Sequence, residues 1–165
     1  MRAPMTAYDP AEWSDLFVAT AGASAALAGL VFVAVSINIE RILKFQGLPE
    51  RALETVLTLL GVVVISILGL MPGQSHVALG LEVAVVSAIL AVSIAQLARA
   101  GRSPESEPAP WMVARVALST MPQVIGGVSL VAEAGGGLYW IAAGIIFAIA
   151  GAVANAWVLL VEILR

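Results

Sequence analysis

Five long apolar stretches, separated by short polar or glycine- and proline-rich segments, constrain this sequence more than any other feature. A helix needs about 20 residues, at roughly 1.5 Å each, to cross the hydrocarbon core of a bilayer. The stretches that meet this length lie at about residues 14–43, 50–71, 76–98, 111–132 and 138–164. The sequence therefore predicts an all-α integral membrane bundle of five transmembrane helices, in which residues 1–165 form a single domain.

The composition agrees with a fold whose solvent is lipid. Hydrophobic residues make up 61% of the 165 residues and charged residues 12%, whereas a soluble domain carries about 25% charged residues. Such a chain has too few polar side chains to cover itself in water, but in a bilayer its apolar side chains face an apolar solvent. The net charge of −3 argues against a nucleic-acid partner, so we expect the lipid bilayer to be the main partner.

The first stretch is long enough to allow two interpretations of its end. A continuous helix from Ser14 to about Phe45 would be on the order of 48 Å long, and its last turns would stand in water. Alternatively, a tilted helix ends earlier and a bend follows at the membrane surface. Both interpretations agree with the sequence.

Basic residues are distributed unevenly between the two sides that the five stretches define. Cytoplasmic loops of membrane proteins are enriched in Lys and Arg. Arg2 alone lies on the N-terminal side, and the other seven of the eight basic residues lie on the opposite side: Arg41, Lys44, Arg51, Arg99, Arg102, Arg115 and Arg165. This predicts an N-terminus outside and a C-terminus in the cytoplasm, which requires an odd number of spans.

Small residues recur at every fourth position in the first and the fifth stretch. A spacing of four places them on one helix face, and small faces let helices approach closely in lipid. The candidate helix-packing or oligomer-interface residues are Gly22, Ala25 and Gly29 in the first stretch and Gly144, Ala148 and Ala152 in the fifth. They indicate either packing within the bundle or an interface between subunits, and two such faces favour a homo-oligomer.

Polar residues gather in the middle of the fourth stretch, at Ser119, Thr120 and Gln123. Between them, Pro122 has no N–H to donate and its ring clashes with the preceding turn, which predicts a kink or a broken turn. Carbonyls freed at membrane depth are tolerated where protein or a water-filled cavity satisfies them. These four residues therefore predict a polar pathway, or alternatively a kink that neighbouring helices satisfy without a ligand.

Glu82 is a further candidate for this polar pathway. If the third helix begins at His76, Glu82 lies roughly 9 Å into it, and an ionisable residue at membrane depth indicates function. If the helix begins near Gly80, Glu82 is an ordinary residue of the membrane surface. His76 is the single histidine, and one histidine does not make a metal site.

Other polar residues predict structural roles. Asn38 and Asn155 are expected to form hydrogen bonds between helices. Most charged residues near the inner surface are expected to extend to the membrane interface, and Arg51, three residues before Glu54, is the candidate partner of that glutamate.

The sequence lacks the motifs of common enzymes and channels. It contains no cysteine, and it has no nucleophile elbow, zinc-protease motif, phosphate-binding loop or potassium-selectivity filter. We therefore predict no catalytic residue, no cofactor and no metal. The leading hypothesis is a non-enzymatic multi-pass membrane protein that self-associates or serves as an accessory subunit of a membrane complex. The alternative is an oligomeric channel, or a transporter of ions or small solutes.

Several short segments resemble one family. They are Trp13–Phe17, then AGASAALAGLVFVAVSINIERIL at residues 21–43, Pro49–Ala52 and Met71–Gln74. Together they resemble a family of small uncharacterised bacterial inner-membrane proteins, over about the first half of the chain. The resemblance implies a multi-pass protein of the bacterial plasma membrane.

Overall fold

The computed structural model describes residues 5–101 and 110–164, and in these residues it contains helices and no strand. The helices, in chain order, are η1 (Met5–Ala7), η2 (Pro10–Trp13), α1 (Ser14–Ile37), α2 (Ile39–Ile42), α3 (Leu48–Gly69), α4 (His76–Ala100), α5 (Pro110–Ala132) and α6 (Gly137–Leu164).

Five of these helices are long and apolar enough to cross a membrane, namely α1 together with η2, α3, α4, α5 and α6. They confirm the predicted fold class, an all-α bundle with five transmembrane helices. The direction in which the bundle crosses the membrane remains a prediction from the basic residues. Three of those residues, Arg2, Arg102 and Arg165, lie outside the described part of the chain.

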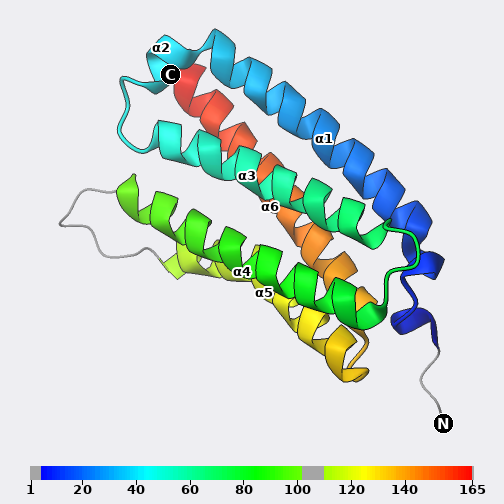
Figure 1. Ribbon diagram of the computed structural model, residues 1–165. Coiled ribbons are helices and arrows are strands. Elements are labelled where there is room, and N and C mark those ends of the chain that lie inside the picture. The colour runs from blue at the N-terminus through cyan, green and yellow to red at the C-terminus, as the bar shows by residue number, and fades with distance from the viewer. Residues whose placement is uncertain (1–4, 102–109, 165) are drawn as a thin grey trace.

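The helices pack around a central pair, α3 and α6 (Figure 1). On one side α1 packs along α3, and on the other side α4 and α5 pack as a second pair against the centre. The main apolar core draws on all five long helices: Phe17, Val62, Ile65, Leu79, Val83, Leu130, Leu138, Ile141, Ile145 and Ala148. Since α1 has its main contact with α3, much of its surface is left facing outward.

α1 ends with a bend, so the interpretation as a continuous helix to Phe45 is wrong. The backbone N–H of Asn38 donates to the carbonyl of Val35 over 3.2 Å, instead of to that of Ala34 as a regular helix requires. The Asn38 side chain takes the vacated place, because its Nδ2 donates to the Ala34 carbonyl over 2.9 Å. Asn38 therefore bonds within its own helix and not, as predicted, to a neighbouring one.

The N-terminal segment closes the end of the bundle where α5 turns into α6. The Trp13 indole N–H donates to the Thr6 carbonyl over 2.7 Å, and the Gly136 N–H donates to the Tyr8 hydroxyl over 2.9 Å. The rings of Trp13 and Tyr139 meet edge to face, with centroids 4.8 Å apart. Gly136 has a φ of +92°, which other residues rarely adopt.

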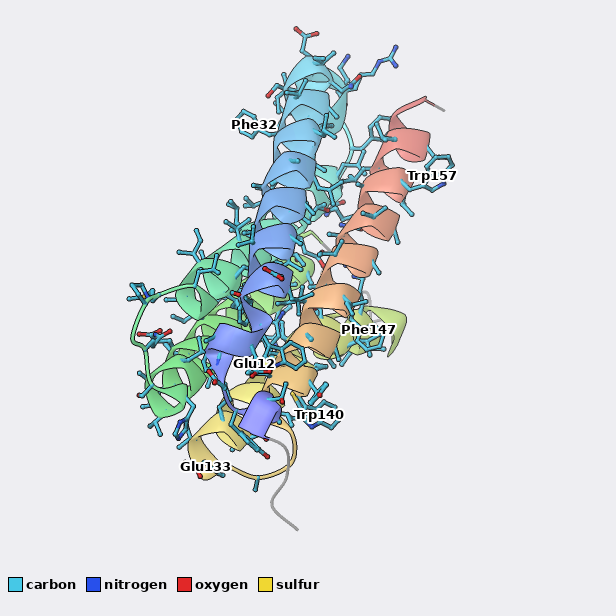
Figure 2. All side chains as sticks on the ribbon, turned by 90° about the vertical axis from the view of Figure 1, so that its right-hand side faces the viewer. Glu12, Phe32, Glu133, Trp140, Phe147 and Trp157 are labelled. Atoms are coloured by element: carbon cyan, nitrogen blue, oxygen red, sulfur yellow. The ribbon has the colours of Figure 1, made fainter. Side chains whose placement is uncertain are left out.

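An apolar groove of about 250 Å³ separates α1 from α6 in the half of the bundle away from the N-terminal segment. Leu27, Val31 and Val35 of α1 and Ala152 and Leu160 of α6 are among the residues that line it. Figure 2 shows the two helices side by side, with Phe32 and Trp157 on their outer sides, pointing away from each other. Both aromatic side chains are exposed, as expected for surfaces that lipid covers.

Candidate functional site

Three long helices meet in a buried polar centre, which we define as Glu54 and Thr55 of α3, Arg115 of α5 and Asn155 of α6. The Arg115 Nη2 donates to both carboxylate oxygens of Glu54, over 2.6 and 2.8 Å. The side chain of Glu54 is 8% exposed and that of Arg115 is 22% exposed. A charge in a lipid-spanning segment is stabilised when an opposite charge meets it inside the bundle, and this pair provides that compensation.

Asn155 connects the ion pair to the rest of the bundle. Its Oδ1 accepts from the Arg115 Nη1 over 2.9 Å. Its Nδ2 donates to the Thr55 hydroxyl over 2.6 Å and to the Arg51 carbonyl over 3.2 Å. The prediction that Asn155 bonds between helices is therefore confirmed.

Sequence reasoning missed this centre. It expected the charged residues of this region at the membrane interface and gave Glu54 the partner Arg51. Arg51 does act electrostatically on Glu54, but Glu54 is buried and forms its hydrogen-bonded ion pair with Arg115. The two residues are 61 positions apart, so local spacing does not reveal the pair. A signal was present, because Arg115 lies within an apolar stretch, four residues before Ser119 and eight before Gln123.

Arg115, Ser119 and Gln123 lie along one face of α5, which we call the polar line. A spacing of four residues keeps them on that face, and it packs against the small-residue stripe of α6. A Cβ at Gly144 would approach the Gln123 Cγ to 2.5 Å, so Gly144 gives the glutamine its room. Ala148 and Ala152 of the same stripe are buried, and both lie beside Ser119 and Arg115 around a cavity of about 10 Å³, enough for one water molecule.

The polar line is closed at Gln123. Its side chain is 2% exposed, and its Oε1 accepts from the Ser87 hydroxyl of α4 over 3.2 Å. The hydroxyls of Ser119 and Thr120 both donate to the Val116 carbonyl in their own helix. The structure thus places Ser119 and Gln123 on the same line as the polar centre, but both side chains form their hydrogen bonds with other groups of the protein.

α5 continues as a helix through Pro122, so the predicted broken turn does not occur. A proline inside a membrane helix removes one hydrogen bond, and the helix is tolerated where neighbouring helices pack around it. Pro122 is buried against such neighbours.

Glu82 does not join the polar line. α4 begins at His76, so Glu82 lies in its second turn, where the carboxylate is partly exposed and accepts a hydrogen bond from the Gln74 amide. His76 lies beside Glu133, with its Nε2 2.8 Å from the carboxylate of that residue.

A second cavity, of about 430 Å³, lies where α3 begins and α4 ends. We call it the vestibule, and define it by its lining residues: Phe45, Gln46, Gly47, Leu48, Glu50, Arg51, Glu54, Leu97, Ala98 and Gly101. Glu54 lines both the vestibule and the small cavity of the polar centre. The polar line therefore starts from an open space at one end of the bundle.

The small residues of α1 are arranged differently from those of α6. The side of α1 that packs on the bundle carries Thr20, Ser24 and Ala28, which are buried. The outward face of α1, defined by Gly22, Ala25, Ala26 and Gly29, is exposed. A Cβ added at Gly22 or Gly29 would have no neighbouring atom within 4 Å, so nothing in the described chain uses this face.

Comparison with known proteins adds no further assignment: no family model, no curated protein and no solved structure matches this chain. In the described residues, no group of three or more His, Asp or Glu side chains is placed to hold a metal ion. What the protein does must therefore be inferred from the polar centre, the vestibule and the outward face of α1.

Proposed function

We propose that this chain is a non-enzymatic multi-pass membrane protein that associates with a second copy of itself through the outward face of α1. One observation carries the proposal: of the two small-residue stripes, the one on α6 is covered within the chain, and the one on α1 is not. In lipid, small faces drive association because helix backbones approach closely and gain van der Waals contact.

The position of α1 supports this role. It lies at one edge of the bundle (Figure 1), and 22% of its most apolar window is buried, compared with 50% for α3. Bulky exposed side chains, Val18 and Val33, flank the small residues along the helix. Small residues between bulkier side chains let the backbone of a second helix approach closely.

The test is the oligomeric state of the detergent-purified protein, measured by light scattering and by crosslinking in membranes. We expect a defined oligomer for the natural sequence and dissociation for Gly29→Leu, because the leucine would keep the backbones apart. Ala88→Leu is the matched control, since Ala88 is exposed on α4, away from this face. An unchanged mass for Gly29→Leu would refute association through α1.

We further propose that the protein resides in the bacterial plasma membrane, with its N-terminus outside. The resemblance of its first half and the sorting of its basic residues support this location. Reporter fusions to the two chain ends test the orientation, and reporters active on the same side of the membrane would contradict it.

Passage of an ion or small solute is a second candidate function, and the polar line of α5 is the observation that favours it. The route would start at the vestibule, pass Glu54 and Arg115, and reach Gln123. Its closure at Gln123 means that passage needs a movement of α5 or α6. Flux into liposomes that Gln123→Leu alters, and Ala88→Leu does not, would support this function, whereas absence of flux would exclude it.

A further inference from the structure

The apolar groove between α1 and α6 is a space that the described chain leaves open. Its lining consists of aliphatic side chains and one tryptophan, and it includes the buried Leu59 of α3, which packs with Ala28 and Ala152. The groove stays open because small side chains line both walls, among them Ala34 of α1 and Ala156 of α6. Apolar spaces do not hold water, so in a membrane this groove takes up hydrocarbon.

The shape of the groove selects a thin occupant. Its lining runs from Leu27 to Val35 on α1 and from Ala152 to Leu160 on α6, which is about 12 Å along each helix. A volume of about 250 Å³ over that length gives a mean cross-section of roughly 20 Å², whereas a helix with its side chains is about 10–12 Å across. A helix of a second copy is therefore too wide to enter. The length is close to the roughly 15 Å of hydrocarbon in one leaflet, which suits a single acyl chain.

Basic side chains lie at one end of the groove. Ile42 of α2 lines that end and packs with Leu159, so α2 lies beside the last turns of α6 (Figure 1). Arg41 and Lys44 are exposed there, and Glu40 is the single acidic residue of the segment between α1 and α3, which is therefore net positive. Among the described residues, no carboxylate pairs with the Lys44 ammonium. Basic groups at the end of a membrane-spanning helix attract anionic head groups.

We propose that the groove binds one acyl chain of an anionic phospholipid, whose phosphate lies against Lys44 and Arg41. The apolar walls hold the chain, and the basic side chains select the head group. This site does not compete with self-association, because Leu27 of the groove and Gly29 of the outward face are about 200° apart around α1. The proposal therefore stands or falls independently of the oligomeric state.

The test uses the full-length protein in nanodiscs that contain equal amounts of phosphatidylcholine and phosphatidylglycerol with the same acyl chains. After transfer to detergent, native mass spectrometry counts the lipids that stay on each chain, and thermal unfolding in parallel shows whether each variant is folded. The two lipids share the phosphate, but the choline group of phosphatidylcholine compensates its charge. We expect each chain to retain one phosphatidylglycerol in preference to phosphatidylcholine.

Lys44→Gln tests the selection of the head group. We expect about fivefold weaker retention of phosphatidylglycerol, since one basic residue near the membrane surface contributes about 1 kcal/mol to the binding of anionic lipid. Arg99→Gln is the matched control. It makes the same change of charge at an exposed position at the end of α4, which does not line the groove.

Ala34→Leu and Ala156→Leu test the seat of the acyl chain from the two walls. Each adds three carbon atoms inside the groove and leaves the charges of α2 in place, so each should reduce the number of retained lipids. Ala154→Leu is the control on α6, because Ala154 is exposed and does not line the groove.

The variants together decide the proposal. Preference for phosphatidylglycerol that weakens in Lys44→Gln and in the two groove variants, and persists in both controls, supports it. Equal retention of the two lipids would overturn it, and so would equal effects of Lys44→Gln and Arg99→Gln, or full retention in both folded groove variants. Absence of retained lipid together with loss of the oligomer in Ala156→Leu would assign the groove to a second copy instead.

Discussion

The small-residue stripes of α1 and α6 follow the same spacing in the sequence, yet they face opposite environments. On α6, Gly144, Ala148 and Ala152 are buried within the bundle, and Gly144 gives room to Gln123 of the polar line. On α1, the same kind of stripe has no neighbour within the described chain. The comparison shows that small residues in a membrane helix mark a face that is approached either by large side chains or by the backbone of another helix. Which of the two it is depends on the neighbouring helix.

The largest effect is expected where the polar line begins, at Arg115. Arg115→Met would leave the buried Glu54 carboxylate without its counter-charge, which costs about 3–5 kcal/mol in the free energy of unfolding. Unfolding in detergent, followed by circular dichroism, measures this loss. The double variant Glu54→Gln/Arg115→Met should recover part of it, because it removes both charges. A single variant as stable as the natural protein would contradict a compensating role for Arg115.

Ala148→Leu tests the buried stripe directly. Ala148 is 2% exposed and lies in the apolar core, so three additional carbon atoms have no space and should destabilise the fold by about 1–3 kcal/mol. Ala150→Leu on the same helix is the control, since Ala150 is exposed. Equal unfolding midpoints for the two variants would show that α6 does not pack as described.

Asn155→Leu should have a smaller effect, about 1 kcal/mol, because hydrogen bonds between membrane helices contribute about 0.6 kcal/mol on average and up to about 1.7. The loss arises from the contacts of Asn155 with Thr55 and Arg115. The same unfolding experiment measures it. If the variant instead loses as much stability as Arg115→Met, the ion pair depends on Asn155 for its geometry.

Gly29→Leu should change the stability of the monomer least. The leucine side chain would point away from the bundle, and leucine is a better helix former than glycine. The free energy of unfolding should therefore rise, by no more than about 1 kcal/mol. Unfolding of the monomer in a dissociating detergent measures this. A large destabilisation would show that the outward face of α1 is covered within the chain, and the contrast with α6 would disappear.

The fold was largely predictable from the sequence because bilayer thickness fixes the length of each span. Polar, glycine- and proline-rich segments of the sequence, such as Pro72–Gly73 between α3 and α4, then separate the spans. The bend after α1 was harder to predict. It depends on whether the Asn38 side chain or a backbone N–H takes the carbonyl of Ala34, and the two arrangements have the same hydropathy.

The candidate site was predictable only in part. Ser119 and Gln123 were identified from their depth in an apolar stretch, and they do lie on the polar line. Glu54 was not identified, because its partner Arg115 comes from another helix and only the packing of three helices brings the two together. The two stripes were detected but not distinguished, since spacing defines a face and does not say what the face meets.

The contact between Tyr8 and Gly136 has a consequence for how the chain is assembled. The two residues are 128 positions apart, and ribosomes add about 5–20 residues per second. Tyr8 therefore waits roughly 6–25 s for the turn that it holds. Tyr8 is made long before the turn that it contacts, so its hydrogen bond with Gly136 can form only after α1, α3, α4 and α5 have been synthesised.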